Sequence, residues 1–249
     1  MKLENYEVHL PSYSIGDKIY EKIGPVCESY GKKVLVIGGR KALAAAYDKI
    51  AAYVAQTNLE IIGTEIYGEN CTYATVERLR ALPLYQEADM VFGVGGGKAL
   101  DTVKCLCIPD DKPVFSFPTI ASNCAATTSV SILYNEDGTF LKPHFFIRPV
   151  MHAFIDTQII AQAPSQYMWA GIGDTYAKYY EGRAAGAFHR RGGGGQSDVP
   201  GPFAAVQRPG FRGSQAGLVY LCGRAGSAGH CGHHRDRLHL SHQGLHARL

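Results

Sequence analysis

The stretch Val91-Phe-Gly-Val-Gly-Gly-Gly-Lys-Ala-Leu-Asp101 decides the fold of this chain. A short apolar run ends in three consecutive glycines, and helix-forming residues follow them. Glycines let the backbone turn sharply and approach a ligand closely, and the unpaired N–H groups at the start of a helix favour a phosphate. The spacing is neither Gly-x-Gly-x-x-Gly nor a Walker P-loop. We predict a strand, a phosphate-binding turn and a helix, with a tight turn that binds nothing as the alternative.

The same alternation of strand and helix continues along most of the chain. Strands are predicted at residues 33–38, 60–67, 90–94, 113–117 and 152–156, and the short apolar runs at 33–38 and 113–117 predict buried strands. Helices are predicted at residues 42–56, 73–85 and 99–107, and a hairpin at 130–138. Strands that alternate with helices are typical of a parallel, doubly wound sheet. We therefore expect an α/β domain over residues 1–162.

A helical region is predicted to begin after this domain. Pro164 can occupy the first turn of a helix that continues through Trp169, Ile172, Tyr176 and Tyr180. We expect residues 163–181 to form the first helix of an α-helical domain. The apolar surface of this helix predicts poor solubility or self-association, and a homo-oligomer is one form that self-association would take.

The composition changes abruptly at about Gly182. The first 181 residues contain twelve lysines and four arginines, whereas the last 68 contain no lysine and nine arginines. The tail also holds fifteen of the 29 glycines and shows no apolar periodicity. We expect residues 182–249 to be disordered, and we interpret them as the product of a frameshift or truncation. A small metal site at His230-Cys-Gly-His-His234 is the alternative, although this spacing fits no standard zinc module.

Composition argues against several classes of protein. No stretch approaches the roughly 20 apolar residues that span a bilayer, and the N-terminus lacks the apolar region of a secretory signal. We expect a cytoplasmic protein with no membrane partner. The seven cysteines show no framework spacing, which predicts reduced thiols. A net charge of +3 gives little support for binding of nucleic acid.

The glycine-rich stretch and four later segments resemble one enzyme family. Gly93-Val-Gly-Gly-Gly-Lys-Ala-Leu-Asp-Thr-Val-Lys104 is similar to the glycine signature of the glycerol dehydrogenase branch of the iron-containing alcohol dehydrogenases. The later segments agree in order and spacing: Pro118-Thr-Ile-Ala-Ser122, Ser131-Ile-Leu-Tyr-Asn-Glu-Asp-Gly138, Phe154-Ile-Asp-Thr-Gln-Ile-Ile-Ala-Gln-Ala-Pro164 and Ala170-Gly-Ile-Gly-Asp-Thr-Tyr-Ala-Lys178. The resemblance implies a dehydroquinate synthase-like nucleotide-binding domain, followed by only the start of a helical domain.

The resemblance also implies a cofactor site. It places four residues around the pyrophosphate of NAD: Gly95, Gly96, Gly97 and Lys98. It places five more along the rest of the cofactor: Thr119, Ser122, Thr128, Val130 and Tyr134. Without the resemblance, the hydroxyl groups would be interpreted as satisfying loop backbone, and Val130 and Tyr134 as hairpin core.

Asp174 corresponds to the family's aspartate ligand for a divalent zinc or iron ion. Zinc takes about three protein ligands plus an open position, and the family obtains two more from histidines of its second domain. The metal polarises the substrate hydroxyl while a hydride passes to the nicotinamide. We find no counterpart of those histidines and expect weak or absent turnover. The alternative for Asp174 is an ordinary surface aspartate on a helix.

Three positions depart from the family pattern. Cys124 stands where glycerol-specific members carry an aspartate that contacts the polyol, and Ala126 replaces a proline. A thiol accepts hydrogen bonds weakly, which predicts a different or less hydroxylated alcohol. Arg40 follows the first strand, where an acidic residue often holds the adenosine ribose. An arginine at this position can accommodate the 2′-phosphate of NADP. NAD is the expected cofactor, and NADP is the alternative.

The resemblance implies NAD-dependent oxidation of an alcohol or polyol. Two alternatives remain at this point. One is a catalytically inactive nucleotide-binding module. The other is the dehydroquinate synthase or glycerol-1-phosphate dehydrogenase branch, whose phosphate-bearing substrates would call for extra basic residues that we do not locate.

Overall fold

The computed structural model describes His9, residues 11–180 with their side chains, and the backbone of residues 181–191. Residues 1–8, 10 and 192–249 lie outside this description. The predicted disorder beyond residue 191 and the candidate metal site at His230 to His234 therefore lie outside the described residues.

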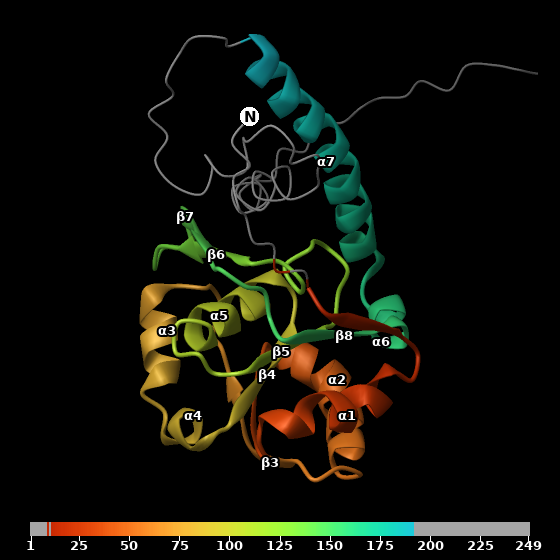
Figure 1. Cartoon of the computed structure of the whole chain (residues 1–249), viewed down its shortest axis with the longest axis vertical. Helices are drawn as coiled ribbons and strands as arrows, with labels where there is room; N and C mark the ends of the chain where they lie inside the picture. Colours follow the sequence, from red (N-terminus) through yellow and green to blue (C-terminus); the bar gives the residue numbers. More distant parts are fainter. Residues whose placement is uncertain (1–8, 10, 192–249) are drawn as a thin grey trace, which may run out of the picture.

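Six parallel strands form one sheet in the order β1-β8-β5-β4-β2-β3 (Figure 1). Their bounds are Tyr13–Gly16 for β1, Lys33–Gly38 for β2, Glu60–Ile66 for β3, Met90–Gly95 for β4, Val114–Pro118 for β5 and His152–Asp156 for β8. Strands β4 and β5 are buried along their whole length, as their continuous apolar runs predict. The predicted parallel α/β sheet is confirmed, and its strands end at one common edge.

The sequence analysis did not predict strand β1, which forms the edge of the sheet beside β8. Its side chains Tyr13 and Ile15 are more than half exposed, so the segment lacks the buried apolar run that identifies the central strands. Pairing of Ser14 with Phe154 nevertheless holds it in register.

Helices cover both faces of the sheet. Figure 1 shows α3, α4 and α5 on one side and α1 and α2 on the other. The bounds are Ile23–Cys27 for α1, Arg40–Val54 for α2, Tyr73–Arg80 for α3, Pro83–Glu87 for α4, Gly97–Cys107 for α5, Thr157–Gln162 for α6 and Ser165–Arg191 for α7. Two short 3-10 helices, Ile19–Lys22 and Glu28–Tyr30, flank α1. The single helix predicted at residues 73–85 is two helices, because Pro83 occupies the first turn of α4 and cannot continue α3.

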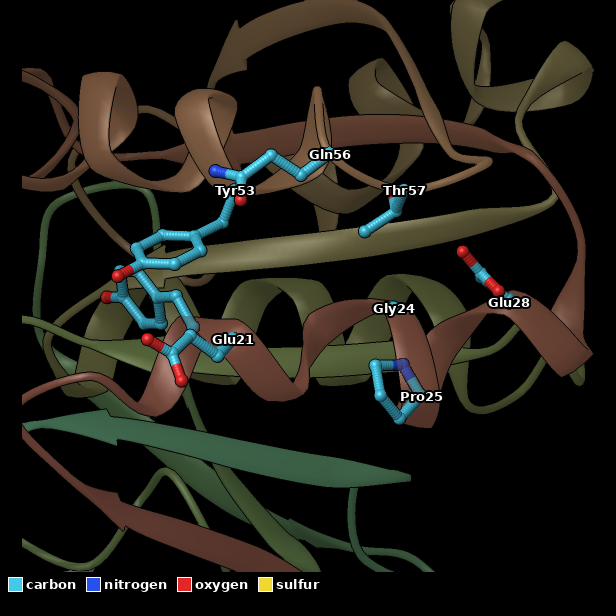
Figure 2. A pocket seen from close by; sticks show the side chains of 8 residues that line it. Glu21, Gly24, Pro25, Glu28, Tyr53, Gln56 and Thr57 are labelled. Carbon is cyan, nitrogen blue, oxygen red and sulfur yellow. The ribbon is translucent and has the colours of Figure 1, made fainter.

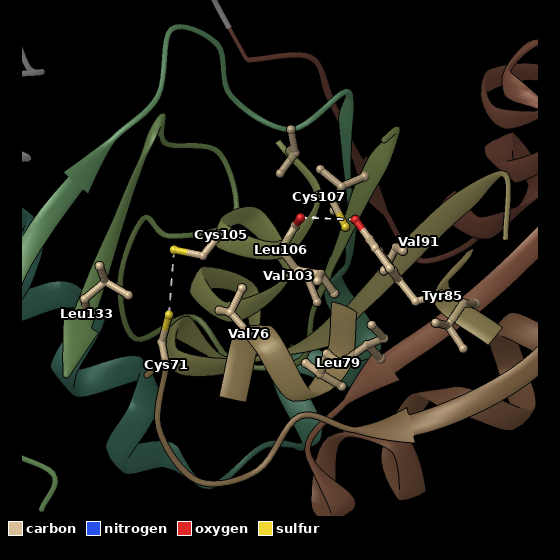
Figure 3. Close-up of a cluster of buried hydrophobic side chains, with 14 of the residues drawn as sticks. Cys71, Val76, Leu79, Tyr85, Val91, Val103, Cys105, Leu106, Cys107 and Leu133 are labelled. Carbon is tan, nitrogen blue, oxygen red and sulfur yellow. Dashed lines mark hydrogen bonds between the residues drawn. The ribbon is translucent and has the colours of Figure 1, made fainter. Parts of the chain in front are cut away.

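Two apolar clusters, one on each face of the sheet, make up the core. The face covered by α1 and α2 is rich in phenylalanine, and the rings of Phe117 and Phe154 stack with centroids 4.9 Å apart. The opposite face packs under α3 and α5 (Figure 3), where the Sγ atoms of Cys71 and Cys105 lie 3.8 Å apart. Burial on both sides fixes the sheet against its helices and so fixes the loops at its edge.

The predicted hairpin is present as β6, Val130–Tyr134, and β7, Phe140–Phe145. It lies against α5 through a hydrogen bond from Ser131 Oγ to the Asp101 carbonyl, 3.0 Å long. A helix is present where one was predicted after the α/β domain, but α7 begins at Ser165, so Pro164 precedes the helix and does not lie in its first turn. The backbone of α7 continues to Arg191, past the compositional boundary at Gly182. Figure 1 shows α7 extending away from the sheet. In the described part of the chain, no helix is long and apolar enough to cross a membrane.

Candidate active site

The glycine turn after β4 has the shape that the sequence predicts for a phosphate site. Gly95 adopts a φ of 153°, which L side chains rarely adopt, and a Cβ there would lie 2.8 Å from the Cβ of Ala99. A Cβ on Gly96 would lie 2.5 Å from Ile120 Cδ1. Gly96 is also the N-cap of α5 and brings no side chain to the first-turn N–H groups. The backbone is therefore open to an anion at the N-terminal end of this helix.

The loop after β5 borders the glycine turn. The Thr119 N–H donates to the Gly95 carbonyl at 3.1 Å, and the side chain of Thr119 is buried. Further along the loop, a Cβ on Gly97 would lie 2.7 Å from Asn123 Nδ2. Ser122 is partly buried between these contacts. Thr119 and Ser122 thus lie in the loop beside the glycines, where the resemblance places them.

Lys98 reaches across this edge of the sheet towards the hairpin. Its Nζ donates to Asn70 Oδ1 at 2.6 Å and lies 5.2 Å from the centre of the Tyr134 ring. The structure therefore brings Lys98 and Tyr134 together. Asn70 was not predicted, since its role depends on a contact between segments that are distant in sequence.

Lys104 is a second residue that the sequence analysis missed. It is fully buried, and its Nζ donates to the carbonyls of Ala125, Thr128 and Val130. The carboxylate of Asp101 lies 2.9 Å away. Burial raises the pKa of Asp101, and the nearby ammonium acts in the opposite direction. Lys104 thus fixes the segment that presents Thr128 and Val130.

The Thr128 hydroxyl is a polar atom without a partner. Its Oγ1 is buried and has no hydrogen-bond partner among the described residues. A buried hydroxyl that lacks a partner costs free energy unless a ligand or water satisfies it. Together with the side-chain-free turn at Gly95 to Gly97, this orphaned donor fits a bound dinucleotide.

Asp174 and Cys124 line one cavity, of about 170 Å³, between the loop after β5 and helix α7. Helix α7 can approach the loop after β5 closely because Gly171 has no side chain. A Cβ on Gly171 would overlap the Ala121 carbonyl oxygen. Asp174 Oδ2 lies 2.6 Å from Nζ of Lys178, one helical turn later. Asn123 lines the same cavity and also contacts the glycine turn. The candidate substrate and metal residues therefore lie beside the candidate cofactor site.

The described residues supply only part of a metal site. Among them, no group of three or more His, Cys, Asp or Glu side chains is placed to hold a metal ion. Asp174 fits the role of one ligand, because its carboxylate faces a cavity and already attracts a cation. Zinc in proteins takes about three such ligands.

A larger cavity, of about 290 Å³, lies between α1 and α2 (Figure 2). Tyr53, Glu21 and Glu28 line it, together with Thr57. Glu28 Oε1 already accepts the N–H of Asn58 at 2.9 Å. None of the predicted site residues lines this cavity, so its size does not make it the active site.

Arg40 begins α2 directly after the first predicted strand and is exposed. The end of that strand borders the glycine turn, because a Cβ on Gly95 would lie 4.0 Å from the Gly39 nitrogen. Arg40 therefore lies at the edge of the sheet that carries the glycine turn.

Residues 11–154 match the family of iron-containing alcohol dehydrogenases. The chain is 38% identical over 120 residues to a glycerol dehydrogenase of Thermotoga maritima, a match covering 48% of this chain and 33% of that protein. It is 37% identical over 145 residues to hydroxycarboxylate dehydrogenase A of Escherichia coli, covering 58% of this chain and 39% of that protein.

The crystal structure of glycerol dehydrogenase from Schizosaccharomyces pombe has the same architecture, with a TM-score of 0.65 and 26% identity. The match covers 74% of this chain and 46% of that structure. The chain therefore spans half or less of the length of these relatives.

Proposed function

The chain belongs to the iron-containing alcohol dehydrogenase family, in its glycerol dehydrogenase-like part, and from this premise we propose that it binds NAD and oxidises an alcohol or polyol. The glycine turn at Gly95 to Gly97 carries the proposal. Its backbone leaves no room for side chains and stands at the N-terminal end of α5, at the carboxyl edge of a parallel sheet. This is the position where open α/β sheets bind nucleotides.

The residues around the turn have separate roles in the proposed complex. The first-turn N–H groups of α5 bind the pyrophosphate, and the ammonium of Lys98 adds positive charge beside it. The Thr128 hydroxyl donates a hydrogen bond to the cofactor. Lys104 holds the backbone at Thr128 in place through its hydrogen bond to the Thr128 carbonyl. NADP is the alternative cofactor, because the guanidinium of Arg40 can accommodate its 2′-phosphate.

The reacting carbon of the substrate would lie in the cavity that Cys124 and Asp174 line. Asn123 joins this cavity to the glycine turn, so a dinucleotide on the turn can extend its nicotinamide towards it. A divalent metal on Asp174 would polarise the alcohol oxygen and lower the pKa of its hydroxyl group. Cys124 faces the substrate with a weakly polar thiol in place of a strong acceptor.

A nucleotide-binding module without turnover is the second candidate. One observation favours it, because the described residues offer Asp174 as a metal ligand without a second or third partner. Such a module would still bind NADH at the glycine turn.

A turnover assay distinguishes the two candidates. Reduction of NAD is followed by absorbance with glycerol and with 1,2-propanediol, after addition of zinc or iron and again after a chelator. We expect NAD reduction that is weak, because Asp174 lacks two partner ligands in the described part of the chain, but that rises with metal and disappears with the chelator and in the Asp174→Asn variant. Binding of NADH without any metal-dependent turnover would contradict the dehydrogenase and select the module.

A further inference from the structure

Two buried cysteines lie in contact on the face of the sheet that α3 and α5 cover, and neither has a role in the proposed reaction. Sγ of Cys71 lies 3.8 Å from Sγ of Cys105 and donates its proton to it (Figure 3). Cys71 precedes α3 and Cys105 lies on α5, so the contact joins segments 34 residues apart. The sulfur atoms of a disulfide lie about 2.0 Å apart, so an approach of roughly 1.8 Å would bond this pair.

The surroundings of the pair favour Cys105 as the nucleophile. The hydrogen bond from Cys71 lowers the pKa of Cys105 below its ordinary value, although burial acts in the opposite direction. The pKa of Cys71 is raised, because its proton is held in that bond and because the thiol is buried. Cys105 is 7% exposed, whereas Cys71 is fully buried. Since the thiolate is the reactive form of cysteine, Cys105 is the sulfur that a small oxidant reaches and oxidises first.

We propose that Cys71 and Cys105 form a reversible disulfide bond when a hydroperoxide oxidises the chain, and that this bond weakens cofactor binding at the glycine turn. The first part stands without the proposed function, and the second part rests on it. The alternative is a pair of cysteines that only pack in the core, which would remain thiols under the same treatment.

The proposed oxidation removes two electrons from the pair. The Cys105 thiolate attacks an oxygen of hydrogen peroxide, the O–O bond breaks, and a sulfenic acid and a hydroxide ion form. The Cys71 sulfur then attacks the Cys105 sulfur, so the S–S bond forms and the S–O bond breaks. The hydroxyl group leaves as water with the Cys71 proton, and the hydroxide ion takes a proton from solvent. A dithiol reductant reverses the step by exchange and is itself oxidised to a disulfide.

The segment at Cys71 supports two residues of the candidate cofactor site. Next to Cys71, Asn70 Oδ1 accepts a hydrogen bond from the Lys98 ammonium at 2.6 Å. The Cys71 carbonyl accepts the N–H of Tyr134 at 2.9 Å, and the centre of the Tyr134 ring lies 5.2 Å from the same ammonium. Residues 67–72 belong to no helix or strand, so they shift more readily than α5. Closing the distance between the sulfur atoms therefore displaces the contacts that hold Lys98.

Peptide mapping of the native full chain tests the bond directly. The reduced chain is treated with hydrogen peroxide, the remaining thiols are blocked with N-ethylmaleimide, and the denatured chain is cut with trypsin without reduction. Trypsin cleaves after Lys104 and so releases Cys105 and Cys107 on one peptide. We expect this peptide to be linked to the one that contains Cys71, and the linkage to disappear after dithiothreitol.

Three variants assign the linkage to its residues. Cys71→Ala and Cys105→Ala should both lose it. Cys107→Ala is the matched control, because Cys107 lies on the same helix as Cys105 and is also buried. This variant should retain the linkage, since the sulfur in contact with Cys71 is still present.

NADH affinity provides the second measurement. Oxidation of the native chain and of Cys107→Ala should weaken NADH binding about tenfold, the effect of one lost charge-assisted contact, and dithiothreitol should restore it. Peroxide should leave the affinity of Cys105→Ala unchanged. Because Cys124 is still present in that variant, an effect that comes from oxidation of Cys124 would persist there.

Each outcome decides the inference. A native chain whose Cys71 and Cys105 are alkylated separately after peroxide would overturn it, as would a linkage that disappears in Cys107→Ala. A Cys71–Cys105 bond that leaves NADH affinity unchanged would overturn the effect on the cofactor. If Cys105→Ala does not fold, Cys71→Ala takes its place. A reduced chain that binds no NADH would overturn the proposed function, whereas the mapping would still decide whether the bond forms.

Discussion

Nζ of Lys104 lies 2.9 Å from Oδ1 of Asp101, although both side chains are buried beneath the β6–β7 hairpin. The same ammonium donates to three backbone carbonyls of the segment that carries Thr128. A buried charge is tolerated when it is paired and hydrogen-bonded in this way. The cluster connects the helix after the glycine turn to the far side of the candidate cofactor site.

Replacing Lys104 by methionine should destabilise the chain by about 3 kcal/mol, because Asp101 then remains as an unpaired buried charge. Urea unfolding measures the loss, and NADH affinity should fall with it as the segment at Thr128 loosens. Lys112→Met is the matched control, since Lys112 also donates to two carbonyls, those of Tyr85 and Ala88. A loss no greater than that of the control would contradict the assigned role.

Gly95→Ala should lower both stability and NADH affinity. A side chain at a φ of 153° is strained by about 1 to 3 kcal/mol, and the new Cβ would also press on Ala99. Gly16→Ala is a suitable control, because a Cβ there meets nothing within 4 Å. Urea midpoints and NADH titrations of both variants give the answer. Equal behaviour of the two would show that the turn does not need its glycine.

Lys98→Gln should weaken NADH binding by about 1.5 kcal/mol, roughly tenfold, through loss of a charge-assisted contact to phosphate. The salt dependence of binding should decrease as well, since one positive charge is removed. The exposed lysine of the hairpin, Lys142, provides the control Lys142→Gln. Unchanged affinity and salt dependence in Lys98→Gln would place the phosphates elsewhere.

Acidification should weaken the attachment of β1 through His152. The buried imidazole contacts Ser12 Oγ at 2.6 Å and Ser14 Oγ at 2.9 Å, and burial lowers its pKa below the ordinary value. Above about pH 6.5 the histidine is neutral in both folded and unfolded chains, so the stability is complete. Below that, the unfolded chain takes up the proton first, and stability falls as pH drops towards the folded pKa.

Urea midpoints at about pH 7.5 and about pH 5.5 measure this effect in the native chain and in His152→Gln. The fall between the two pH values should be smaller in the variant. The difference between the chains isolates His152 from His144, whose pKa is lowered by its own burial and by Lys142. An equal fall in both chains would show that His152 does not contribute.

The central strands β2, β4 and β5 could be predicted because they are short apolar runs that end in glycine or proline. The edge strand β1 could not, since Tyr13 and Ile15 face outwards and leave no such run. The break between α3 and α4 follows from Pro83, which the apolar pattern of residues 73–85 obscures. The apolar pattern of the sequence therefore predicts the central strands of the sheet better than its edge strand.

The glycine turn of the candidate site could also be predicted, because its residues are contiguous and their chemistry is local. Lys104 could not, since a lysine three residues after Asp101 on a helix resembles an exposed surface pair. Only the hairpin above it makes the pair buried. Asn70 was missed for a related reason, because its contact with Lys98 joins segments that are distant in the sequence.

Titration of the purified full chain with NADH, followed by nicotinamide fluorescence, tests the central claim most directly. A dinucleotide on the glycine turn predicts a saturable change in fluorescence with one NADH per chain, displaced by NAD. The affinity should be lower in Gly95→Ala and unchanged in Gly16→Ala. A folded native chain whose addition leaves NADH fluorescence unchanged would contradict the claim that this turn is a cofactor site.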